Sequence, residues 1–153
     1  MDAVTYPQPE VTRFIREQFV PVKVNVISGD AKQIAHLHHL WTPAFVVLEG
    51  ERECERRYGF LPPEEMSAWL RLALGDRALS RGRYDEAAAW FNEAGRAFPQ
   101  SAFTPRALYW EGVARYRQSG DHTALRPPWS DLAHRFPESS WSRAVAWAVT
   151  RTG

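Results

Sequence analysis

Residues 41–65 read Trp-Thr-Pro-Ala-Phe-Val-Val-Leu-Glu-Gly-Glu-Arg-Glu-Cys-Glu-Arg-Arg-Tyr-Gly-Phe-Leu-Pro-Pro-Glu-Glu, and this stretch decides the fold of the first half of the chain. Residues 44–48 are apolar throughout, which predicts a strand covered on both faces. Residues 49–51, Glu-Gly-Glu, predict a hairpin turn into a second strand over residues 52–58, which ends at Gly59. The prolines and glutamates at 62–65 are typical of a first helical turn.

The second half of the chain predicts helices only, beginning near Trp69, with breaks at residues 81–83, 98–99, 119–121 and 136–137. Residues 98–103, Phe-Pro-Gln-Ser-Ala-Phe, return 38 residues later as Phe-Pro-Glu-Ser-Ser-Trp, and Gly82, Phe91 and Ala94 have counterparts in Gly120, Trp129 and Leu132. A repeat of about 20 to 50 residues built from helix pairs indicates a solenoid, in which each unit buries its apolar face on its neighbour.

The end of this helical region predicts two further features. The Arg-Pro-Pro triplet at 126–128 should delay a helix, because proline lacks an N–H group and clashes with the preceding turn. Residues 140–149 should form a capping helix that places Trp141, Val145 and Ala148 on the last helix pair.

The first 40 residues predict a helix, a strand and a second helix. Apolar residues from Val11 to Phe19 recur at helical spacing after Pro9, so we expect an amphipathic helix that starts near Pro9. Residues 20–27 alternate β-branched side chains and predict a strand. Residues 31–40 carry apolar side chains on one side and predict a short helix before the turn at Thr42-Pro43.

The composition limits the classes of function. The chain has 153 residues, a formal net charge of +1 and one cysteine, so it gives no general attraction to nucleic acid or acidic membranes and cannot form an intramolecular disulfide. Its longest apolar run is far shorter than a membrane helix, and its first residues lack the charged and apolar regions of a signal peptide. We therefore expect a cytoplasmic protein without membrane contact.

Eight residues in the first helical hairpin sit in the spacing of a tetratricopeptide (TPR) motif: Leu74, Gly75, Gly82, Tyr84, Ala87, Phe91, Ala94 and Pro99. The region resembles TPR proteins on these residues, although Ala78 replaces the usual aromatic of the first helix. Small residues such as Gly75 and Ala87 would let two helices cross closely while the aromatic side chains fill the gap. The second copy is degenerate, because of its Arg-Pro-Pro triplet.

The order of elements before Trp69 resembles the thioredoxin fold from the end of its first active-site helix onward. The Trp41-Thr42-Pro43 segment matches the surroundings of that family's cis-proline, and residues 58–65 match the entry into its final helix. More narrowly, the chain is similar to bacterial thioredoxin-like proteins with a C-terminal TPR extension. The resemblance implies that the segment Trp41-Thr42-Pro43 lies on the surface that faces an extended substrate peptide, which such folds bind by main-chain hydrogen bonds. Two roles stay open for Trp41 and Phe60, contact with the peptide or a structural part of the domain, and the structural role is favoured for Phe60.

The chain departs from that family at the redox site. It contains no Cys-x-x-Cys motif, and Cys54 falls inside a predicted strand rather than at a helix start where its thiolate would be stabilised. The strand that precedes this motif in the family is also missing, which leaves a vacant slot between residues 20–27 and 44–48. Three outcomes are open: the two strands pair directly, another chain donates a strand, or the natural protein starts upstream.

Other candidate sites are weaker. His36 and His39 share a predicted helix face but His38 points elsewhere, so we interpret the three as solvated histidines rather than a metal site. The charged run at 51–57 is typical of a protected edge strand rather than a catalytic carboxylate pair. Most of the seven tryptophans should be core or repeat-stacking residues, with Trp41 as the exception. We expect no catalytic residue, metal or cofactor.

The sequence thus predicts an α/β plus all-α protein: an incomplete thioredoxin-like domain over residues 1–68 and TPR-like helical hairpins over residues 69–153. The favoured function is a non-catalytic protein-interaction module that binds a protein or peptide through the cis-proline surface or the helices, with a homodimer possible. The alternative is a fragment of a thioredoxin-like disulfide oxidoreductase or redox chaperone whose Cys-x-x-Cys segment lies upstream.

Overall fold

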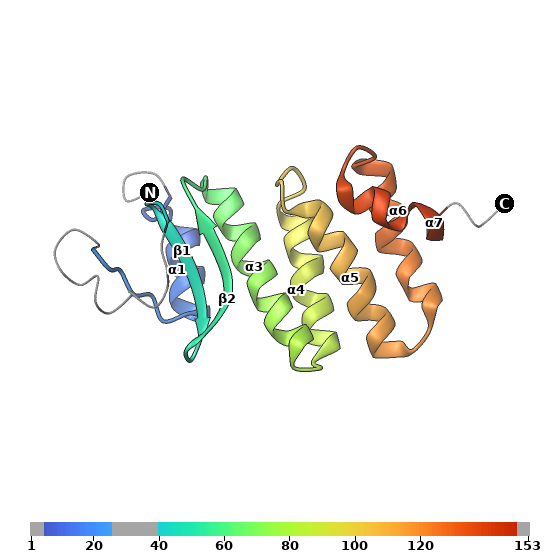
Figure 1. Ribbon diagram of the computed structural model, residues 1–153, viewed down its shortest axis with the longest axis horizontal. Coiled ribbons are helices and arrows are strands. Elements are labelled where there is room, and N and C mark those ends of the chain that lie inside the picture. Colours follow the sequence, from blue (N-terminus) through green and yellow to red (C-terminus); the bar gives the residue numbers. More distant parts are fainter. Residues whose placement is uncertain (1–4, 26–39, 150–153) are drawn as a thin grey trace. The chain divides into compact units, whose positions relative to one another are not determined.

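The computed structural model describes residues 5–25 and 40–149, and the chain divides into two compact units, Met1–Met66 and Ser67–Gly153. The described residues form six α-helices, one short 3-10 helix and a two-stranded antiparallel sheet (Figure 1). The sheet lies in the first unit, and the described residues of the second unit form helices and turns. The expectation of a mixed α and β part followed by helices is confirmed at this level.

Helix α1 spans Pro9–Gln18 in the first unit, so the prediction of an amphipathic helix that starts near Pro9 is confirmed. Pro9 occupies the first turn, where its missing N–H group costs nothing, and Glu10 lies where the helix dipole favours a negative charge. Val11 is buried, and the helix is followed by the C-cap residue Phe19, whose N–H donates to the Ile15 carbonyl oxygen.

The predicted strand over residues 20–27 is wrong in its described part, because residues 20–25 are not in a strand. Val20 and Val22 are almost fully exposed, so their alternating side chains cover no core. Alternation favours a strand only when the side chains pack against cross-strand neighbours, and the sequence cannot supply that information locally. The rest of this predicted strand, residues 26–27, lies outside the described residues. Residues 31–39 of the predicted short helix lie outside them as well.

Strands β1, Ala44–Glu49, and β2, Arg52–Tyr58, form the predicted hairpin. Their register runs from Ala44 opposite Tyr58 to Glu49 opposite Arg52, and Gly50 adopts a φ of +61° in the turn. The expectation that β1 is covered on both faces is only partly met, because residues 44–47 are half-buried and Leu48 is exposed. Within the described part of the chain, the sheet contains these two strands alone.

The helical part follows the predicted breaks. Its α-helices are α3, Pro63–Ser80; α4, Tyr84–Ala97; α5, Thr104–Ser119; α6, Arg126–Arg135; and α7, Ser140–Val149. The 3-10 helix η2, His122–Leu125, precedes α6, so the Arg-Pro-Pro triplet delays the helix as expected and its prolines occupy the first turn of α6. In the described ranges, no helix combines the length and apolar character needed to cross a bilayer.

The internal repeat is visible in the backbone and in the hydrogen bonds. Phe98 and Phe136 end α4 and α6 with similar dihedral angles, φ −128° and ψ 62° against φ −132° and ψ 54°. The hydroxyl of Thr104 donates to the Phe98 carbonyl oxygen at 2.6 Å, and the hydroxyl of Ser142 donates to the Phe136 carbonyl oxygen at 2.5 Å. These hydroxyls are 38 residues apart and buried, so both repeat units use the same hydrogen bond to join the end of one helix to the first turn of the next.

The core of the second unit depends on glycines that lie under aromatic rings. A Cβ atom at Gly75 of α3 would lie 2.5 Å from the ring of Phe91 on α4. A Cβ atom at Gly112 of α5 would lie 2.6 Å from Nε1 of Trp129 on α6. The close crossing predicted for the first helix pair is therefore present, and the second pair repeats it with a larger ring.

Candidate peptide-binding surface

The candidate site lies where residues 40–43 lead into the first strand and residues 58–60 leave the second. The Gly59 N–H donates to the Pro43 carbonyl oxygen at 2.8 Å, next to the last cross-strand pair, Ala44 and Tyr58. Gly59 has a φ of +85°, a conformation that glycine adopts without steric cost. The peptide bond between Thr42 and Pro43 is cis. The two segments therefore meet at one end of the hairpin.

Large apolar side chains are exposed at this end of the hairpin. The exposed fractions are 82% for Leu40, 70% for Trp41 and 53% for Phe60. Exposed apolar side chains of this size indicate a binding surface more strongly than exposed polar side chains do. Water is a poor solvent for apolar groups, and binding removes them from water. We call the group the loop–hairpin surface; its residues are Leu40, Trp41, Thr42, Pro43, Tyr58 and Phe60.

The main chain of the loop–hairpin surface can also contribute. Within the described residues, neither Trp41 nor Thr42 makes a backbone hydrogen bond, and both residues are exposed. Their N–H and carbonyl groups can therefore bond to an extended chain without breaking a hydrogen bond to another described residue. Main-chain bonds of this kind give affinity, while pockets or faces for alternate side chains give specificity.

A charged pair on the second strand borders the surface. The Arg56 guanidinium donates Nε to Glu53 at 2.7 Å and Nη1 to the Tyr58 hydroxyl at 3.1 Å, and its carbon lies 5.6 Å from the centre of the Tyr58 ring. The hydrogen bonds from Arg56 lower the pKa of Glu53 below its ordinary value, and they raise the pKa of Arg56. Arg56 thereby holds the Tyr58 ring in place beside the exposed side chains.

Cys54 is the one cysteine of the chain and does not belong to the loop–hairpin surface. Cys54 is half-buried in the irregular part of the hairpin register, and its thiol donates to the Arg52 carbonyl oxygen at 3.8 Å. The described ranges contain no cluster of histidine, cysteine and acidic side chains that could hold a metal ion. The histidine group at residues 36–39 lies outside the described residues.

Most of the residues predicted for TPR packing lie in the core of the second unit, whereas Gly82 and Pro99 are exposed at helix ends. Leu74, Ala87, Phe91 and Ala94 are buried, as are Gly75 and the non-aromatic Ala78. Gly82 forms the turn after α3 with a φ of +72°, and Pro99 follows the end of α4. Tyr84 is half-buried, and its hydroxyl accepts from Nη2 of Arg117 at 2.5 Å.

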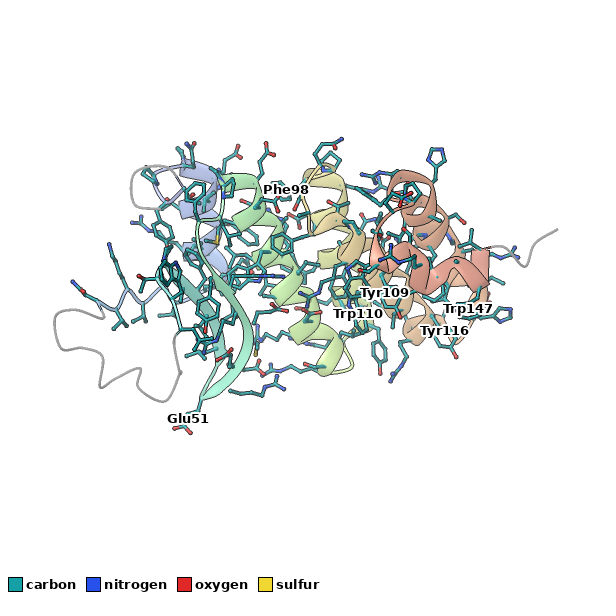
Figure 2. The ribbon with its side chains drawn as sticks, turned by 45° about the horizontal axis from the view of Figure 1, so that its top comes forward. Glu51, Phe98, Tyr109, Trp110, Tyr116 and Trp147 are labelled. Carbon is teal, nitrogen blue, oxygen red and sulfur yellow. The ribbon has the colours of Figure 1, made fainter. Side chains whose placement is uncertain are left out.

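The structure adds contacts that the sequence analysis missed. Gly112 of α5 lies under the ring of Trp129, as Gly75 of α3 lies under the ring of Phe91. The two glycines are 37 residues apart, so a comparison at a fixed offset of 38 residues does not align them. The Tyr109 ring stacks on Trp129 at 5.5 Å and meets Trp141 at 5.1 Å, which joins α5, α6 and α7. Figure 2 shows Tyr109 beside Trp110 on α5, with Trp147 further along on α7. We expected Trp41 to be the exception among tryptophans that lie in the core or stack between repeats, but Trp147 is also exposed, at 61%.

The chain matches no protein-family model, no curated protein and no solved structure. The argument about function therefore starts from the residues of the loop–hairpin surface.

Proposed function

We propose that this chain is a non-catalytic protein-interaction module, in which a redox-inactive thioredoxin-like domain is followed by TPR-like helices. The loop–hairpin surface of the first unit binds an extended peptide. Its ligand is a segment with large apolar side chains at alternate positions, because successive side chains of an extended chain point to opposite sides.

One observation carries the proposal: Trp41 and Phe60 are exposed next to main-chain groups that have no partner in the described residues. Aromatic side chains dominate binding energy at interfaces, since each buries a large apolar area with few torsions to fix. Free main-chain groups beside them would fix the direction of the bound chain. A surface of this kind suits a peptide better than a small polar metabolite.

The helical part supports the same class of function. The described helices repeat one hairpin with the same glycine-under-ring packing and the same hydroxyl-to-carbonyl hydrogen bond between consecutive helices. Repeated helical hairpins of this type serve as scaffolds for recognition of other proteins. The Glu111 carboxylate on α5 is buried and accepts hydrogen bonds from Asn92 and Arg115, so it stabilises the scaffold rather than facing a substrate.

The test starts with selection of phage-displayed random peptides on the full chain. The affinity of an enriched peptide is then measured by calorimetry for the wild type and for Trp41→Ser and Phe60→Ser. Loss of an aromatic anchor costs more than about 1.4 kcal/mol, so each variant should bind at least about tenfold more weakly. Methylation of one backbone nitrogen of the peptide should weaken binding as well, if main-chain bonds contribute.

Tyr116→Ser is the matched control, because Tyr116 is another exposed aromatic residue but lies on α5. This variant should bind the peptide as the wild type does. Selection that enriches no peptide, or an enriched peptide whose affinity is the same for Trp41→Ser and the wild type, would contradict the proposal.

A further inference from the structure

Helix α7 has the position of a first helix in a repeat unit. Its Ser142 corresponds to Thr104 of α5, since both hydroxyls bond the carbonyl oxygen of the phenylalanine that ends the preceding helix. The same 38-residue offset relates Trp147 to Tyr109. Tyr109 is covered by the Trp129 ring, which stacks on it with an interplanar angle of 17°. Trp147 meets Trp129 only edge-on and leaves most of its surface exposed.

The two sides of α7 differ sharply. Ser142 and Val145 are buried, and Trp141 and Ala148 pack on the cluster around Leu132. The opposite side exposes four residues: Arg143, Ala144, Ala146 and Trp147. Helix α7 contains no acidic residue, so this exposed side carries one cation, one large aromatic ring and two small residues.

Within one chain, the Arg143 guanidinium and the Trp147 ring on α7 make no cation–π contact with each other among the described residues. Arg143 donates Nη1 to the Glu138 carbonyl oxygen at 2.8 Å, which directs its guanidinium toward the start of the helix. In the described part of the chain, Arg143 has no carboxylate partner and does not lie over an aromatic ring. Trp147 lies one turn later on the same side, where residues four apart are neighbours. Both groups therefore face outward.

This exposed side is complementary to itself. When two copies of a helix pair antiparallel about a two-fold axis at the level of residue 145, position 143 of one lies opposite position 147 of the other. Each Arg143 would then lie over the partner's Trp147, and tryptophan is the ring that attracts a cation most strongly. Ala144 and Ala146 lie on the two flanks of this contact, where their small side chains leave room for Arg143 and Trp147. A two-fold interface requires reciprocal pairing of this kind.

We propose that α7 is a homodimer interface, in which two copies pair antiparallel and exchange the Arg143–Trp147 contact. The contact area is that of two ten-residue helices, so the dimer is weak and dissociates on dilution. The proposal uses the second unit alone and is independent of peptide binding at the loop–hairpin surface. A peptide with acidic and aromatic side chains is the competing occupant of this surface.

The test is analytical ultracentrifugation of the full chain from about 1 µM to about 1 mM, the range in which a small interface dissociates. The wild type should pass from the monomer mass of 17.6 kDa toward twice that value as concentration rises. Arg143→Glu should remain monomeric over this range, because the new carboxylate repels the face of the partner's ring. Arg143→Lys keeps a cation and should still dimerise.

Trp147→Ser provides a second test and should also remain monomeric. The controls are Arg126→Glu and Tyr116→Ser, which change an exposed cation and an exposed ring outside α7 and should leave dimerisation unchanged. Circular dichroism of each variant checks that the helices are intact. A wild type that is monomeric at every concentration overturns the proposal, and so does a dimer that persists in folded Arg143→Glu, since its interface must then lie elsewhere.

Discussion

Replacement of Gly75 by alanine tests how closely α3 and α4 cross. A Cβ atom at this position would lie 2.5, 2.7 and 2.8 Å from three carbon atoms of the Phe91 ring. Ordinary contacts of a Cβ atom begin near 3.4 Å, so the ring must move by about 0.9 Å, the difference between 3.4 and 2.5 Å. Phe91 is completely buried, and a packed core offers little room for that movement.

The expected loss of stability follows from two opposing effects. Overpacking of a well-packed core costs up to about 3 kcal/mol, and three simultaneous close contacts place Gly75→Ala near that upper end. Alanine in place of glycine inside a helix contributes about 1 kcal/mol in the opposite direction. We therefore expect Gly75→Ala to lower the free energy of unfolding by about 2 kcal/mol.

Gly95→Ala is the matched control. Gly95 is also buried within a helix, but a Cβ atom there would meet Leu108 at 3.6 Å, an ordinary contact. Only the helix-propensity effect applies, so this variant should be more stable than the wild type by about 0.5 to 1 kcal/mol. The two substitutions are chemically identical, and their effects should have opposite signs.

Urea unfolding followed by circular dichroism measures both variants at equal protein concentration. The double variant Gly75→Ala, Phe91→Leu should lose less stability than the sum of its single variants, because the smaller side chain relieves the overlap. If Gly75→Ala stabilised the protein as Gly95→Ala does, the close crossing of α3 and α4 would be wrong.

Three further predictions concern the cap at the end of α5, a buried hydroxyl group and a carboxylate. Gly120 ends α5 with a φ of +73°, so Gly120→Ala should destabilise the protein by about 1 kcal/mol in urea unfolding, and an equally stable variant would contradict the left-handed cap. Thr104→Val removes the buried hydroxyl that bonds Phe98 and should cost about 1 to 2 kcal/mol by the same assay, whereas no change would refute the role of this bond. The pKa of Glu53 is lowered by its hydrogen bonds to Arg56, so its NMR titration midpoint should lie below 4.5 and move up in Arg56→Gln. Because the folded-state pKa is the lower one, this pair stabilises the fold above the ordinary pKa and loses its effect as pH falls through the folded value.

Local rules in the sequence were enough to predict most elements. Proline at the start of α1 and α6, glycine at Gly50 and Gly120, and the repeated Phe-Pro pairs define where chain segments begin and end. These residues act through their own φ angles and missing N–H groups, so their effect needs no distant partner. The same applies to α7, whose range of residues 140–149 was predicted from periodicity.

Only part of the loop–hairpin surface could be predicted from the sequence. Residues 41–43 and 60 were singled out by resemblance, and their exposure could not be derived from the sequence. The hydrogen bond from Gly59 to Pro43 joins two segments that are distant along the chain, and only the hairpin register brings them together. The free main-chain groups of Trp41 and Thr42, within the described residues, are likewise a result of that geometry.

What the sequence determined by itself is helix α1, the hairpin, the breaks between the later helices and the 38-residue repeat, because backbone preference and periodicity are local properties. The tertiary structure alone decided which tryptophans are buried: Trp69 and Trp129 lie in the core, while Trp41 and Trp147 are exposed. It also decided that residues 20–25 are not a strand, although their pattern alternates. Burial and strand formation depend on what packs against a residue, and those neighbours are brought there by the fold rather than by the local sequence.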